Sequence, residues 1–179
     1  MRLWGIFGRG LGLVVMGVLA WQALRRGVTF APPGALLGIL DGANLIFHEA
    51  GHVLFVFFGE FLQVLGGSVT QVAIPAMCAG YFARRRQPAA LAAALFWAGE
   101  STTNVAIYVA DARRLALPLL GGDGTTHDWN YLLERLGLLE WADLLGRLVF
   151  ALGAVAILAA AALLAADILR NWSQATTNE

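Results

Sequence analysis

The sequence predicts an all-α fold, a polytopic membrane helix bundle that forms one transmembrane domain over residues 1–179. The chain is 59% hydrophobic and only 13% charged, with a mean hydropathy of +0.68. Soluble domains average about 45–50% apolar and about 25% charged residues. The apolar residues gather in five runs, each near the roughly 20 residues that a helix needs to cross a bilayer. We therefore expect an integral, multi-pass protein of about five transmembrane helices, surrounded by lipid.

The first two helices are expected over residues 3–24 and 34–58. The first run stops at a pair of arginines and shows no small-residue cleavage site, which favours a retained helix over a signal peptide. A pair of prolines precedes the second run, and proline favours the first turn of a helix.

Three further helices are expected over residues 61–82, 88–110 and 144–166. A polar loop, residues 111–143, separates the last two. It holds a glycine-rich turn and then a short stretch whose leucines fall on one stripe, with Asp128 as its expected N-cap. This pattern predicts an additional interfacial helix that lies on the membrane surface or on the bundle.

Five crossings would place the two chain termini on opposite sides of the membrane. The connection after the first helix, the connection after the third and the C-terminus would then share one side. Compact arginine clusters mark both connections, which favours that side as cytoplasmic.

The charge balance excludes one class of partner. All twelve basic residues are arginine, twelve acidic residues balance them, and the net charge is zero. A nucleic-acid-binding protein would carry a basic face, so we expect no nucleic-acid partner.

The chemical signal lies inside the second helix, which carries the HExxH motif His48-Glu49-Ala50-Gly51-His52. Residues four apart share one face of a helix, so the two imidazoles can bind one metal ion. The glutamate between them is then placed to take a proton from water. These residue types predict a single Zn²⁺ ion with His48 and His52 as ligands and Glu49 as the general base.

Two other interpretations of the motif remain open. Polar side chains in an apolar span can form a buried hydrogen-bond network, and a histidine pair can bind haem. Burying even one charge at this depth costs about 2.5–3.5 kcal/mol. The motif therefore needs partners or a ligand, which favours the metal site.

Other polar residues are expected at the same depth as the motif. At about 1.5 Å of rise per residue, Glu100 of the fourth helix falls level with His48, and Asn104 falls level with His52. Gln71 of the third helix lies at a similar depth. These side chains are candidates for a further metal ligand or for orienting the ligands.

A catalytic zinc site needs a third protein ligand. Glu100 is one candidate. The loop sequence Asp123-Gly124-Thr125-Thr126-His127-Asp128-Trp129 supplies the others, namely Asp123, His127 and Asp128.

The embedded HExGH motif, followed by Gly-Glu and Gly-Gly-Ser segments, resembles the site-2 protease family of intramembrane zinc metallopeptidases. The strings FHEAGH, FGEF, NVAIYVADAR and HDWNYLL are also similar to those of a group of bacterial multi-pass membrane proteins. This second resemblance covers about residues 40–140 and implies a bacterial inner membrane location. It also implies that the HDW segment belongs to the site, which favours His127 over Glu100 as third ligand.

We therefore expect a membrane-embedded zinc metallopeptidase-like protein that hydrolyses a peptide bond in or near the membrane. Its substrate would be a membrane protein or peptide. The alternative is a non-proteolytic metal-binding protein or a structural subunit of a membrane complex, with other subunits as partners.

Overall fold

The structure, a computed structural model, describes residues 2–29, 31–117 and 127–176. All regular structure in these residues is helical, and they contain no strand. In chain order the elements are α1 (Arg2–Arg26), α2 (Ala35–Leu54), the 3₁₀ helix η1 (Val56–Phe58), α3 (Glu60–Arg84), α4 (Pro88–Asp111), α5 (Asp128–Arg135), the 3₁₀ helix η2 (Leu139–Trp141) and α6 (Ala142–Thr176).

Three helical segments of the described chain are long and apolar enough to cross a membrane, namely Gly5–Arg26, Glu60–Arg84 and Leu139–Thr176. The protein is therefore an all-α membrane protein with three candidate spans. The helices α2 and α4 contain 20 and 24 residues, but polar side chains in the middle of each lower its hydropathy. Helices are present at all five predicted positions.

The second and fifth helices differ most from their predicted bounds. The second ends at Leu54, and the chain turns through η1 to Gly59 before α3 begins. Gly59 has a φ of +88°, a backbone conformation that favours glycine. The last helix begins at Ala142 and continues to Thr176, ten residues past its predicted end.

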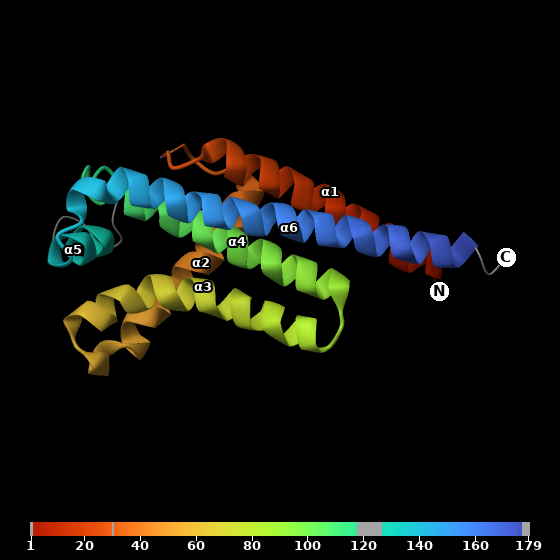
Figure 1. Cartoon of the computed structure of the whole chain (residues 1–179), viewed down its shortest axis with the longest axis horizontal. Coiled ribbons are helices and arrows are strands. Elements are labelled where there is room, and N and C mark those ends of the chain that lie inside the picture. Colours follow the sequence, from red (N-terminus) through yellow and green to blue (C-terminus); the bar gives the residue numbers. More distant parts are fainter. Residues whose placement is uncertain (1, 30, 118–126, 177–179) are drawn as a thin grey trace.

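The helices form one elongated bundle (Figure 1). The start of α1 and the end of α6 lie at one end of it with the α3–α4 connection, whereas α5 and the α2–α3 turn lie at the other end. The helix α2 crosses the bundle obliquely and does not return to the end that carries the termini. This arrangement corrects the topology expected above, in which the termini lie on opposite sides.

The tightest packing joins α4 to α6 through glycines. A Cβ atom on Gly153 would lie 2.7 Å from the carbonyl oxygen of Gly99, and a Cβ atom on Gly146 would lie 2.6 Å from the Cβ of Ala110. Small residues let helix backbones approach closely where hydrophobic burial gives little driving force. The central helix α4 is thereby held between α6 on one side and α3 on the other.

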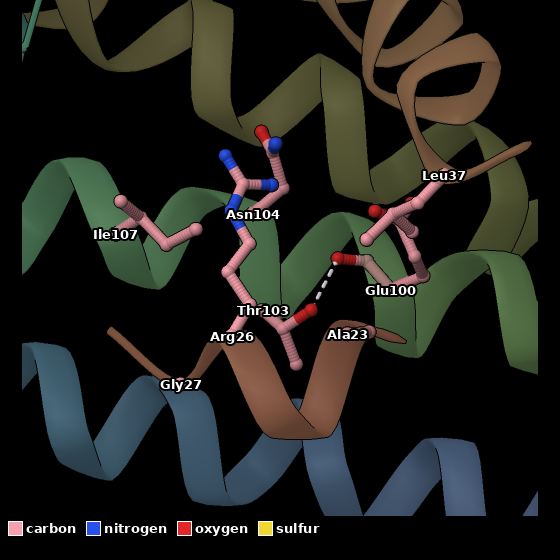
Figure 2. Close-up of a pocket in the computed structure, with 8 residues that line it drawn as sticks. All are labelled: Ala23, Arg26, Gly27, Leu37, Glu100, Thr103, Asn104 and Ile107. Atoms are coloured by element: carbon pink, nitrogen blue, oxygen red, sulfur yellow. Dashed lines mark hydrogen bonds between the residues drawn. The ribbon is translucent and has the colours of Figure 1, made fainter. Parts of the chain in front are cut away.

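A small pocket lies where the end of α1 meets the start of α2 and the middle of α4 (Figure 2). Its interior has room for about one water molecule. The guanidinium group of Arg26 reaches from α1 towards Asn104 of α4, and its Nε atom is buried and has no hydrogen-bond partner in the part of the chain that the structure describes. Glu100 also lines this pocket and is 1% exposed.

Candidate metal centre

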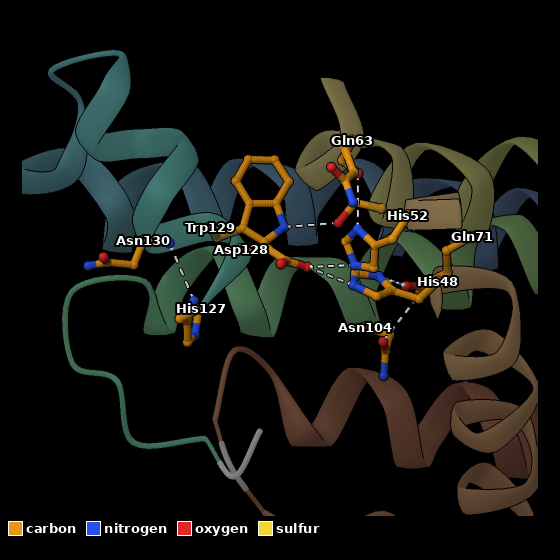
Figure 3. A network of polar contacts seen from close by, with 10 residues as sticks. His48, His52, Gln63, Gln71, Asn104, His127, Asp128, Trp129 and Asn130 are labelled. Carbon is orange, nitrogen blue, oxygen red and sulfur yellow. Dashed lines mark hydrogen bonds and ion pairs between the residues drawn. The ribbon is translucent and has the colours of Figure 1, made fainter. Parts of the chain in front are cut away.

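The two histidines of the HExxH motif point from α2 towards one carboxylate oxygen (Figure 3). The Nε2 atom of His48 lies 2.8 Å from Oδ2 of Asp128, and the Nε2 atom of His52 lies 3.2 Å from the same oxygen. All three atoms lie within 4.8 Å of one another. The structure thus brings together two imidazole nitrogens and a carboxylate, the donor set of a transition-metal site.

The other ring nitrogens of the two histidines face carbonyl oxygens. The Nδ1 atom of His48 lies 3.2 Å from Oε1 of Gln71, and the Nδ1 atom of His52 lies 3.0 Å from the backbone oxygen of Gln63. A carbonyl only accepts, so each Nδ1 donates a proton to it. Each Nε2 then faces Asp128 and is the nitrogen that would bind a metal in place of its proton, the orientation that outer partners commonly impose on ligating histidines.

Glycines on two helices make the space for this cluster. A Cβ atom on Gly51 of α2 would clash with the carbonyl oxygen of Gly66 on α3, so the two backbones touch at this level. A Cβ atom on Gly67 would lie 2.7 Å from Nε2 of His52 and 2.8 Å from Nε2 of His48. A side chain at position 67 would therefore crowd both imidazoles, and the donor set of two imidazoles and a carboxylate fits a zinc ion.

The short helix α5 carries the third member of the cluster. Asp128 is its first residue, and the indole of Trp129 donates a hydrogen bond of 3.0 Å to Oγ of Ser68 on α3. Leu132 and Leu133 are buried against the bundle. Burial alone would raise the pKa of Asp128, but hydrogen bonds from the two histidines outweigh it and lower the pKa to about 2. The carboxylate is therefore ionised and ready to bind a cation.

Glu49 lies on the same turn of α2 as the two histidines. It is exposed and makes no hydrogen bond or ion pair with any other residue that the structure describes. Its carboxylate therefore has no partner among the described residues.

His127, the favoured third ligand in the sequence, does not join the cluster. Its side chain caps α5 by accepting a hydrogen bond of 3.3 Å from the backbone N–H of Asn130, a role expected for Asp128. Its Nε2 atom lies 3.3 Å from Oδ2 of Asp111, and both side chains are buried. The helix turn therefore directs Asp128, and not its neighbour, towards His48 and His52. Asp123 lies outside the described residues.

Glu100 also lies away from the two histidines. It accepts a hydrogen bond of 2.7 Å from Nδ2 of Asn44, which is one helical turn before His48 on α2. The depth estimate assumed parallel helices. Because α2 slants across the bundle, equal distances along α2 and α4 do not give equal depths (Figure 1).

Gln71 lies beside the cluster, at the depth expected of it, whereas Asn104 does not reach His52 and instead donates a hydrogen bond of 3.0 Å to Oδ1 of Asp41, near the start of α2. Gln71 contacts His48 directly, and its Nε2 atom donates a hydrogen bond of 3.0 Å to Oδ1 of Asn104. Tyr108 was not predicted to lie at the site, although its ring centroid is 6.4 Å from that of His48 and 6.5 Å from that of His127. Tyr108 is four residues after Asn104 and so shares its face of the helix, and this spacing is the signal in the sequence that could have identified it.

No family model, curated protein or solved structure matches this chain.

Proposed function

We propose that this protein is a membrane-embedded zinc metallopeptidase. The observation that carries the proposal is the convergence of His48 Nε2, His52 Nε2 and Asp128 Oδ2, with Glu49 unpaired on the adjacent position of α2. Among the described residues the group has three members. Three protein ligands favour a catalytic site, because structural zinc sites usually have four.

One Zn²⁺ ion would be held by the two histidines and Asp128. When bound, zinc lowers the pKa of water to about 7 and polarises a carbonyl group. The carboxylate of Glu49 would accept a proton from the attacking water and pass it to the leaving amine. Gln71 and the backbone carbonyl of Gln63 would keep the two imidazoles in their binding orientation.

We further propose that all five long helices lie in the membrane of the cell, a bacterial inner membrane as the resemblance implies. Helix α4 is about 36 Å long at 1.5 Å per residue, enough for a crossing, and its polar residues face the bundle interior. Helix α2 would be embedded at a slant. The substrate would then be a membrane protein or peptide whose bond reaches the level of the cluster.

Metal analysis of the purified protein in mild detergent tests the proposal first. We expect about one zinc ion per chain in the wild type and none in the His48→Ala/His52→Ala variant. Labelled transmembrane peptides in liposomes then test hydrolysis. The Glu49→Gln variant should keep zinc and lose about 100-fold or more in rate, since general acid–base catalysis contributes about 10²–10⁴-fold. A wild type that binds no zinc after reloading would overturn the proposal.

The second candidate is a non-proteolytic metal-binding or structural subunit. It is favoured by the contacts of Asp128 with both histidines, because these contacts already give the buried polar groups partners without any catalytic role. Zinc binding without any cleavage, together with unchanged behaviour of the Glu49→Gln variant, would support this candidate.

A further inference from the structure

We propose that Arg26 and Asp41 are positioning residues that set which nitrogen of His48 is free to bind the metal. They act through a chain of hydrogen bonds with a single direction, which runs through Asn104 and Gln71. The inference rests on the proposed metal site and adds the residues that control it.

The far end of the chain has a fixed direction. The Nη1 atom of Arg26 donates to Oδ2 of Asp41 at 2.7 Å, and the two side chains are 15% and 17% exposed. Arginine only donates hydrogen bonds and an ionised aspartate only accepts them. The second oxygen of Asp41 must therefore accept as well.

That oxygen fixes the amide of Asn104. The Nδ2 atom of Asn104 donates to Oδ1 of Asp41 at 3.0 Å, which leaves Oδ1 of Asn104 to face Gln71. Gln71 then donates from Nε2 at 3.0 Å, and the same nitrogen also reaches the backbone oxygen of Ser101 at 3.4 Å. Neither amide can be reversed without bringing two donors or two acceptors together.

The near end of the chain is the imidazole of His48. Because Gln71 presents Oε1 to Nδ1 of His48 at 3.2 Å, Nδ1 must carry a proton, and Nε2, which faces Asp128 at 2.8 Å, is the nitrogen whose proton a metal would displace. Arg26 of α1 and Asp41 of α2 therefore determine which ring nitrogen of His48 carries the fixed proton.

His52 differs in this respect. Its Nδ1 atom faces the backbone oxygen of Gln63 at 3.0 Å. A backbone carbonyl always accepts, so the tautomer of His52 needs no such chain. Of the two histidines, only His48 is thus controlled by the side chains of Arg26 and Asp41.

The test is Asp41→Asn, which changes one oxygen to a nitrogen and keeps the shape. With Arg26 still donating, the new amide must turn its own nitrogen towards Asn104. That nitrogen then faces the Nδ2 donor of Asn104, unless the amides of Asn104 and Gln71 both reverse. Reversal of both amides would place a proton on Nε2 of His48. We expect zinc affinity, measured by competition with a chelator, to fall about 10- to 100-fold, the usual loss when an outer partner of a ligand is removed.

A second change should reverse the effect. In the double variant Arg26→Gln/Asp41→Asn, position 26 can accept from the new amide, so the original direction is restored. We expect its zinc affinity to return to within about threefold of the wild type. A merely structural ion pair would give the opposite result, because the double variant has lost both of its charges.

The proton on His48 can be observed directly. The chain has only three histidines, so ¹⁵N-histidine NMR of the zinc-loaded protein can assign each ring. We expect protonated Nδ1 and metal-bound Nε2 for His48 in the wild type and in the double variant, and loss of this pattern in Asp41→Asn.

The matched control is Asp167→Asn, the same change in the ion pair that Asp167 forms with Arg9 at 2.6 Å, remote from the chain. Its zinc affinity should equal that of the wild type. If the wild type binds zinc and Asp41→Asn binds it equally well, or if the double variant binds no better than Asp41→Asn, this inference is overturned while the metal site stands. A wild type without zinc overturns the proposed function instead.

Discussion

At the scale of single residues, the backbone of Gly67 lies against the two imidazoles of the cluster. Its missing Cβ atom would lie 2.7 and 2.8 Å from the two ligating nitrogens. The Gly67→Ala variant should therefore crowd the histidines at a cost of about 1–3 kcal/mol, which corresponds to a loss of zinc affinity of about 5- to 150-fold. Competition with a chelator measures this loss.

Gly80 provides the matched control on the same helix, because nothing lies within 4 Å of its Cβ position. The Gly80→Ala variant should bind zinc as the wild type does and gain slightly in stability, since alanine is a better helix former. Equal zinc affinity in both alanine variants would contradict the proposed location of the ion.

Substitutions at His127 and Asp128 can distinguish the residue that caps α5 from the residue that would bind the metal. His127→Asn should keep zinc, because asparagine is a good N-cap and the cluster does not include this residue. Asp128→Ala should lose zinc, because it removes one of three ligand atoms. Elemental analysis of both purified variants checks the pair. The reverse result would restore His127 as the third ligand, as the sequence favours.

The sequence predicts the two histidines well and the third member poorly, for a physical reason. Positions four apart on a helix share a face wherever that helix lies, so His48 and His52 follow from local geometry alone. Asp128 is 80 residues from His48, and its place depends on how α5 docks. One residue of difference at a helix start decides whether position 127 or 128 faces the cluster.

At the scale of elements, the crossing of α4 and α6 depends on the absence of side chains at Gly153. A Cβ atom there would also lie 2.7 Å from Cγ2 of Thr103. Gly153→Ala should lower the free energy of unfolding by about 1–3 kcal/mol, in spite of the better helix propensity of alanine. Thermal unfolding in detergent measures the change.

The control for this crossing is Gly17→Ala in α1, where nothing lies within 4 Å of the Cβ position. It should leave the unfolding transition unchanged or raise it slightly. If both substitutions lowered the free energy of unfolding to the same extent, the close α4–α6 crossing would not explain the effect of Gly153→Ala.

The helices themselves were predictable from the apolar runs, whereas the slant of α2 was not. Hydropathy measures how much apolar surface a segment offers, but tilt is set by packing against neighbours. For α2 those contacts are the glycines of α3, whose positions relative to Gly51 appear only in the folded chain. The error in the expected level of Glu100 has this origin.

At the scale of the whole molecule, the position of the termini can be tested by labelling. With Cys78 replaced by serine, single cysteines at the exposed positions Arg85 and Glu140 should react with an impermeant maleimide from opposite sides of the membrane. A reporter at the N-terminus should lie on the same side as position 85. Five full crossings would place that reporter with position 140 and would contradict the arrangement in Figure 1.

The wide separation of the ligands along the chain also has a consequence for biosynthesis. Two of the three proposed ligands lie on α2, in the first third of the chain, and the third lies on α5. A nascent chain that has inserted α1 to α4 would hold the two imidazoles but would still lack the carboxylate of Asp128. Zinc loading, and any hydrolytic activity, would thus be delayed until translation has passed residue 128, so the growing chain would stay inactive towards its surroundings.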